Sequence, residues 1–200
     1  MAPVELKTNA KDKLLIAAIK VLRGKGYSAT TVDDLCASAG VTKGAFFHHF
    51  RSKEDLAVSA AEHWSAVTGE LFASAPYHQL RDPLDRVLGY IDFRKQLLQG
   101  ETPEFTCLVG TMVQEVFDSS PRIREACKQS IFSHASEIAK DLELAKKIYA
   151  PRAEWSAEGL ALHTQAVIQG AFILAKAGQS RELAGESITH LRRYLEYLFQ

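Results

Sequence analysis

Apolar residues recur at helical spacing along most of the chain, in blocks separated by short stretches rich in Gly, Pro and Ser. In the first block Leu15, Ile19 and Leu22 share one face, and Gly24 to Gly26 end the pattern. No block convincingly shows the two-residue alternation of a strand, so the sequence predicts an all-α fold. The nine helices that we expect lie at about 9–23, 32–39, 43–49, 52–74, 83–98, 105–117, 121–149, 154–177 and 181–199.

Residues 31–56 are the most informative stretch, because they predict two very short helices joined by a tight turn. Thr31 can cap the first helix, and Asp34 occupies the acidic position of a capping box. Gly40 can adopt the positive φ that a sharp exit from this helix requires, and Thr42 can cap the second helix. This arrangement is typical of a helix-turn-helix, which places its second helix in the DNA major groove.

The second short helix is too short to be stable alone, so its neighbours must hold it. Phe46 and Phe50 have the i, i+4 spacing of an inward face, and we expect His49 to brace the helix with them. The remaining side chains point outward and are available to a partner: Thr42, Lys43, Gly44, Ala45, Phe47 and His48.

Residues 41–56, VTKGAFFHHFRSKEDL, resemble the signature of the TetR family of bacterial transcriptional repressors, and the match extends back through Gly26–Val32. It covers roughly residues 10–58, whereas the rest of the chain matches only in length and helical character. The resemblance implies a DNA-binding domain over 1–52 and an effector-binding and dimerisation domain over 53–200. It also implies a ligand-responsive repressor that binds a palindromic double-stranded DNA operator as a homodimer and is released by a small-molecule effector.

Roles on DNA can be assigned as hypotheses. Lys43 can reach guanine O6 and N7, and the Ala45 methyl can touch a thymine methyl. His48 can reach a base edge or a phosphate, and Lys53 is expected to hold a phosphate. The family usually has tyrosine at position 47, and Phe47 lacks the hydroxyl that would reach a phosphate. The residues that we expect at the DNA are Thr30, Thr31, Thr42, Lys43, Gly44, Ala45, Phe47, His48 and Lys53.

Charge is uneven along a chain whose formal net charge is zero. Residues 1–60 contain nine Lys and Arg against six Asp and Glu, which leaves this part at +3 and the rest at −3. A basic head on an acidic body suits phosphate attraction at one end only. No run of eighteen apolar residues and no apolar signal core occurs, so we expect a cytoplasmic protein without a membrane partner.

The last two predicted helices are apolar around much of their circumference, which indicates more than one neighbour. In TetR-like proteins the corresponding helices form a four-helix dimer interface, although packing within one chain is the alternative explanation. The residues that we expect at the dimer interface are Leu160, Gly170, Ala171, Leu174, Ile188, Leu191, Tyr194 and Leu195.

The resemblance also implies an effector cavity among the middle helices. Its candidate lining is aromatic with few charges, so we expect a small, largely apolar or aromatic molecule. The candidates are Trp64, Phe72, Tyr90, Phe93, Arg94, Cys107, Met112, Gln114, Phe132, Trp155, His163 and Phe172.

Other functions find less support in the sequence. The seven histidines form no metal-ligand pair, and no nucleophile or phosphate-loop motif occurs, so we expect no catalytic residues, no metal site and no cofactor. The three cysteines lack metal spacing, and a thiol-based redox or electrophile sensor at Cys107 is an alternative. Another alternative is a helical regulator that acts through protein contacts, but the compact, basic Lys43-Gly44-Ala45 favours DNA.

Overall fold

The computed structural model describes residues 9–200, which form ten α-helices and one 3-10 helix with no strand among them. The predicted all-α class is therefore confirmed. The elements are α1 (Ala10–Lys25), α2 (Val32–Ala39), α3 (Lys43–His49), α4 (Lys53–Ala73), η1 (Pro76–Gln79), α5 (Pro83–Gln96), α6 (Thr102–Phe105), α7 (Leu108–Val116), α8 (Pro121–Tyr149), α9 (Ala157–Gly178) and α10 (Arg181–Leu198).

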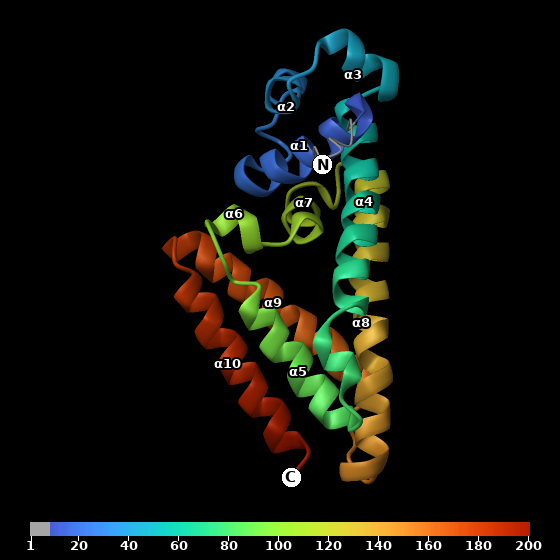
Figure 1. Cartoon of the computed structure of the whole chain (residues 1–200), viewed down its shortest axis with the longest axis vertical. Coiled ribbons are helices and arrows are strands. Elements are labelled where there is room, and N and C mark those ends of the chain that lie inside the picture. Colours follow the sequence, from blue (N-terminus) through green and yellow to red (C-terminus); the bar gives the residue numbers. More distant parts are fainter. Residues whose placement is uncertain (1–8) are drawn as a thin grey trace, which may run out of the picture.

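The molecule is elongated, with α1, α2 and α3 grouped as a head at one end (Figure 1). Helix α4 begins in this head and runs down the body beside α8, the longest helix. Helices α5, α9 and α10 pack together at the other end, where the C-terminus lies. The short α6 and α7 lie directly under α1, between head and body.

One predicted helix, 105–117, is interrupted in the structure. Helix α6 ends at Phe105, and the backbone of Thr106 is extended. Cys107 then starts α7 as its N-cap, with its Sγ accepting a hydrogen bond from the Gly110 amide at 3.4 Å. Apolar composition continues across this break, so hydrophobic pattern alone could not reveal it.

Buried side chains form two hydrophobic clusters. The head cluster consists of Leu14, Leu15, Ala18, Leu22, Leu35, Cys36, Phe46, Phe50, Leu56, Ala57, Ala60, Ala61, Leu108, Val109, Met112, Val116, Ile123 and Cys127. The body cluster is built from η1, α5, the far part of α8, α9 and α10, together with Phe72 of α4 and Phe105 of α6. Cys107 packs against both clusters.

The head cluster extends beyond α1–α3. Leu56 and Ala60 of α4, Met112 of α7 and Ile123 of α8 belong to it and are fully buried. Side-chain packing is therefore continuous across the predicted boundary between the two domains, which lies after residue 52. The first turns of α4 are consequently held by the same buried side chains that hold α1, α2 and α3 together.

Within residues 9–200, none of the helices combines the length and apolar character needed to cross a bilayer.

Candidate DNA interface and effector cavity

Local capping bonds fix the geometry of α2 and α3. The Thr31 hydroxyl accepts from the Asp34 amide at 3.1 Å, and the Asp34 carboxylate accepts from the Thr31 amide at 2.8 Å. Gly40 has φ +62°, in the left-handed region, and lets the chain turn sharply after α2. Thr42 caps α3 by accepting from the Ala45 amide at 3.1 Å. The predicted helix-turn-helix thus follows from bonds that span three or four residues.

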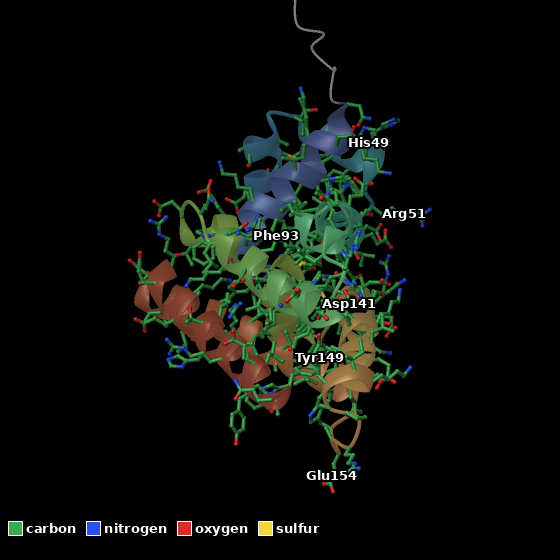
Figure 2. The ribbon with its side chains drawn as sticks, turned by 60° about the horizontal axis from the view of Figure 1, so that its bottom comes forward. His49, Arg51, Phe93, Asp141, Tyr149 and Glu154 are labelled. Atoms are coloured by element: carbon green, nitrogen blue, oxygen red, sulfur yellow. The ribbon has the colours of Figure 1, made fainter. Side chains whose placement is uncertain are left out.

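Helix α3 has one buried side and one exposed side. Phe46 and Phe50 are buried with ring centroids 6.0 Å apart, as their spacing predicted. Phe47 and His48 are exposed on the outer side. His49, which we expected to brace the helix, is also exposed and points into solvent at the head end (Figure 2). The prediction for His49 was wrong because α1 and α2 cover only the side of α3 that contains Phe46 and Phe50.

The N-terminal end of α3 is open and basic. Lys43 is exposed, and its ammonium lies 2.8 Å from a carboxylate oxygen of Asp33 on α2. This ion pair raises the pKa of Lys43, so its positive charge is held at the helix start. A Cβ on Gly44 would approach nothing closer than 3.7 Å, so the backbone here is free to come close to a partner.

Two residues that we expected at the DNA are engaged inside the head. Thr30 is buried, and its hydroxyl donates to the Gly26 carbonyl at 2.6 Å. The Lys53 ammonium donates to the carbonyls of Tyr27 and Thr30 at 2.9 and 2.8 Å. It also lies 4.2 Å from the centroid of the Tyr27 ring. The Thr30 side chain closes the loop after α1 on itself, and Lys53 ties this loop to α4 across twenty-three and twenty-six residues, a distance over which sequence spacing gives no signal.

Glu115 joins α7 to the head. Its two carboxylate oxygens accept from the amides of Tyr27 and Ser28 at 3.1 and 2.9 Å. These amides belong to the loop between α1 and α2, eighty-eight and eighty-seven residues away. Gly26, at φ +83°, leaves room for this carboxylate, because a Cβ there would overlap it. We call this contact the Glu115 bridge.

A second link connects α4 to the start of α8. The Ser120 hydroxyl donates to Glu54 at 2.5 Å, and Arg122 lies 2.8 Å from Asp55 and 3.3 Å from Glu54. The first turn of α4 is thus attached to α8 by polar contacts as well as by the head cluster.

The body contains a cavity of about 670 Å³ bounded by α4, η1, α5, α8 and α9, with α6 and α7 at its head side. This volume falls in the range of small-molecule sites. Part of the predicted lining is brought together here: Trp64, Phe72, Tyr90, Arg94, Cys107 and Phe172.

The other predicted lining residues lie elsewhere. Met112 is fully buried in the head cluster, and Phe132 is exposed on α8. Trp155 stacks edge-on against Phe199 in the body, and His163 lies against Tyr194 on the outer side of α9. Phe93 packs behind Phe72 at a centroid distance of 5.6 Å without reaching the cavity wall, and Gln114 lines a smaller hollow beside α7.

The polar centre of the cavity wall combines the predicted Tyr90 and Arg94 with two residues that sequence reasoning missed, His134 and Gln165. Arg94 donates through Nε to the Tyr90 hydroxyl and through Nη2 to the His134 ring, each at 2.8 Å. Tyr90 and His134 are 3.0 Å apart, and Gln165 donates to the Tyr90 hydroxyl at 2.9 Å. Burial and the adjacent Arg94 charge lower the pKa of His134 to about 3, so its ring is neutral. We call these four residues the Arg94 network.

The residues predicted for the dimer interface divide into two groups. Leu191 and Leu195 are buried within this chain, where α10 packs on α5 and α9, and they belong to the body cluster. Leu160, Ala171 and Ile188 are also buried inside the chain. The exposed members are Leu174 and Tyr194, beside a half-buried Gly170, and Leu162 and Tyr197 add to the exposed apolar surface of these two helices. We call this surface the α9–α10 outer face.

The cysteines differ in access. Cys36 and Cys127 are buried, and burial raises the pKa of the Cys127 thiol to about 12, which keeps it protonated. Cys107 is partly exposed and lines both the cavity and the smaller hollow beside α7.

Comparison with known proteins assigns both ends of the chain. Residues 14–60 match the family described as bacterial regulatory proteins, tetR family, and residues 83–183 match the C-terminal domain of LmrA/YxaF-like transcriptional regulators. The second match alone covers half of the chain.

Curated relatives match more locally. The uncharacterized HTH-type transcriptional regulator YerO of Bacillus subtilis is 39% identical over 54 residues, 27% of this chain and 19% of YerO. The transcriptional regulator AcuR of Cereibacter sphaeroides is 30% identical over 107 residues, 54% of this chain and 49% of AcuR. The chain therefore spans half or less of the length of these two relatives.

Structural similarity extends over the whole chain. A TetR regulatory protein from Rhodobacter sphaeroides superimposes with a TM-score of 0.83 at 24% identity, covering 96% of this chain and all of the other. This likeness shows that head and body together have the fold of that protein. With both family models matched along its length, the chain belongs to the tetR family of bacterial regulatory proteins.

Proposed function

We propose that this protein is a transcriptional repressor that binds a palindromic operator as a homodimer and leaves it when a small molecule fills the body cavity. The observation that carries the proposal is the outer side of α3. Its backbone is held by caps and by the buried Phe46, while Lys43, Gly44 and Phe47 are directed away from the core. A braced short helix with an open basic start suits the major groove.

Each outer residue has a role in this proposal. Lys43 reads a guanine edge, Ala45 contacts a thymine methyl, and His48 reaches a base edge or phosphate. Thr31, Thr42 and Phe47 face the sugar-phosphate backbone from the helix starts and the outer side. Thr30 and Lys53 position this surface from inside the head and make no DNA contact.

Selection of binding sites from a pool of random duplexes, followed by gel-shift titration, tests the DNA role. Lys43→Ala is expected to weaken binding by about 1–3 kcal/mol and to relax selectivity at one base pair. The control is Lys147→Ala, which removes an equally exposed lysine near the far end of α8. Equal affinity and selectivity of the Lys43→Ala variant would contradict the assignment.

Two copies are needed because one α3 reads only a few base pairs. Two-fold symmetry places the two recognition helices roughly 34–36 Å apart, one turn of DNA. For the subunit contact we propose the α9–α10 outer face, since it presents Leu174, Tyr194 and Tyr197 to solvent. Leu191 and Leu195, which sequence alone placed at the interface, support it from inside the chain.

Sedimentation tests this interface. Leu174→Glu combined with Tyr194→Glu is expected to give monomers with unchanged helical content and no operator binding, because a charge is then placed on a face that must be desolvated. Leu144→Glu, at an exposed position of α8, is the matched control and should stay dimeric. A dimeric double variant would place the interface elsewhere.

Release requires the effector to favour a conformation that binds DNA poorly. The cavity walls include α4 and α8, and these helices are tied to the head by the Glu54–Ser120 contact and the head cluster. A molecule in the cavity that moves α4 relative to α8 would therefore change the distance between the two α3 helices of the dimer. Small molecules that raise the temperature of thermal unfolding should also weaken operator binding. Ligands that stabilise the protein without weakening operator binding would argue against release by a molecule in the cavity.

A further inference from the structure

The charged side chains that line the body cavity form two ion pairs and leave one cation over. Arg86 lies 2.7 Å from Asp141, and Lys140 lies 2.6 Å from Glu137. Arg94 makes no ion pair among residues 9–200, and its hydrogen-bond partners there are Tyr90 and His134. The Lys, Arg, Asp and Glu side chains of the cavity wall therefore have a net charge of +1, located at Arg94.

The partners of Arg94 cannot become its counter-ion. The His134 Nε2 that faces Arg94 and Tyr90 is an acceptor in its neutral form, consistent with its lowered pKa. The Tyr90 hydroxyl oxygen accepts hydrogen bonds from Arg94 and Gln165, and its O–H therefore donates to the His134 Nε2. Phe72 covers the guanidinium at 4.3 Å with its ring face. These neutral groups hold the cation in place without neutralising it.

The hydrogen-bond geometry leaves a defined edge of Arg94 available. A guanidinium has five N–H donors, and Tyr90 and His134 take the edge formed by Nε and Nη2. The edge formed by Nη1 and the second Nη2 proton has no protein acceptor among the described residues. Two parallel N–H groups of this kind match the two oxygens of a carboxylate.

From these observations we propose that the effector is a small organic monoanion, a carboxylate attached to an apolar or aromatic body, and that Arg94 binds the carboxylate. The body of the molecule lies against Phe72, Phe105 and Phe172, whose side chains line the same cavity. This proposal rests on the effector role proposed above and specifies its ligand class. A cationic ligand is disfavoured because it would leave two positive charges in one partly enclosed site.

Matched acid and amide probes test the ligand class. We would titrate the DNA-free protein calorimetrically with 2-naphthoate, 2-naphthamide and 2-naphthylmethylammonium, and with phenylacetate and its amide. Each acid is expected to bind about 10- to 100-fold more tightly than its amide, as charge-assisted hydrogen bonds require, and the ammonium should be weakest. Equal binding of acid and amide, or no acid binding at all, would overturn the proposal.

Substitutions in the cavity wall identify the side chain that causes the preference for acid over amide. Arg94→Gln keeps a donor for Tyr90 and should abolish the acid preference, whereas Arg94→Lys should retain part of it. Lys140→Gln removes the same charge from the cavity wall but from a paired, exposed lysine, and should keep the preference. An acid preference that survives Arg94→Gln, in a protein whose thermal unfolding and helical content are intact, would assign the anion to another residue.

Failure of this proposal is distinguishable from failure of the proposed function. Gel shifts with the selected duplex report operator binding independently of the calorimetry. If the amide releases the duplex and the acid does not, the repressor function stands and the carboxylate class falls. If no duplex is bound while acids still outbind amides, the DNA function falls and the ligand class stands.

Discussion

The head cluster and the body cluster are both built from apolar side chains, yet they differ in what they enclose. In the head, Leu14, Phe46 and Leu56 are fully buried against one another's helices. In the body, Phe72, Tyr90 and Phe172 surround a cavity of about 670 Å³. Close packing resists deformation, whereas a cavity leaves helices that a ligand can rearrange. The comparison indicates a stiff reading head attached to a deformable body.

The largest expected effect comes from opening the head cluster. Phe46→Ala removes a fully buried ring and should cost about 3–5 kcal/mol of stability, with loss of operator binding. Hydrogen exchange should then accelerate in α1–α3 more than in α5, α9 and α10.

Phe47→Ala provides the control for this experiment, because the Phe47 ring is exposed and its removal should leave exchange in the head unchanged. Equal acceleration in head and body after Phe46→Ala would show that the two clusters unfold as one unit and would break the comparison.

The next effect concerns the connection between the two regions. Glu115→Ala leaves the amides of Tyr27 and Ser28 without their acceptor, which should destabilise the loop after α1 by about 1–3 kcal/mol. Exchange of these two amides, measured by NMR, should accelerate. Glu125→Ala, at an exposed position of α8, should have no effect on them, and unchanged protection in Glu115→Ala would mean that the bridge is dispensable.

Stability of the body should depend on pH through His134. Its folded pKa of about 3 lies below the ordinary value, so below about pH 6.5 the unfolded state binds the extra proton. The free energy of unfolding therefore falls as pH falls from about 6.5 to 3, by at most about 1.4 kcal/mol per pH unit from this group. Urea unfolding of the wild type and of His134→Asn at pH 7, 6, 5 and 4 isolates the contribution, since the asparagine keeps a neutral acceptor. Parallel curves for the two proteins would rule out His134 as the source.

The smallest expected effect concerns the exposed side of α3, at residue 47. Phe47→Tyr adds a hydroxyl on the exposed side of α3, and one additional phosphate contact should tighten operator binding by about 0.5–1.5 kcal/mol. The gain should be equal for all operator sequences, because phosphate contacts carry no base information. A gain restricted to one operator sequence would place residue 47 at a base edge.

The sequence predicted the head well because its determinants are local. The Thr31–Asp34 capping box, the left-handed Gly40 and the Thr42 cap each act over three or four residues, and all are present as expected. The contacts of Lys53 were not predicted, because its acceptors, the carbonyls of Tyr27 and Thr30, lie twenty-six and twenty-three residues away in a folded loop.

The body was predicted less well because its site is assembled from distant segments. Gln165 bonds to Tyr90 across seventy-five residues, and His134 to Arg94 across forty, so no spacing rule reveals them. An apolar stripe such as that of Leu191 and Leu195 shows that a helix face is covered, but it does not show whether the covering helix belongs to the same chain. Here that face is covered by α5 and α9 of the same chain.

The Glu115 bridge has a consequence for hybrid regulators made by exchanging heads between relatives. The carboxylate on α7 needs a loop that offers two free amides, and a side chain at position 26 would be strained at φ +83° and would displace this carboxylate. A grafted head with another residue at position 26 would weaken the Glu115 bridge, even if every DNA-contacting residue were correct. Positions 26 and 115 therefore have to be transplanted as a pair, and a fusion point placed just after residue 52 would separate them.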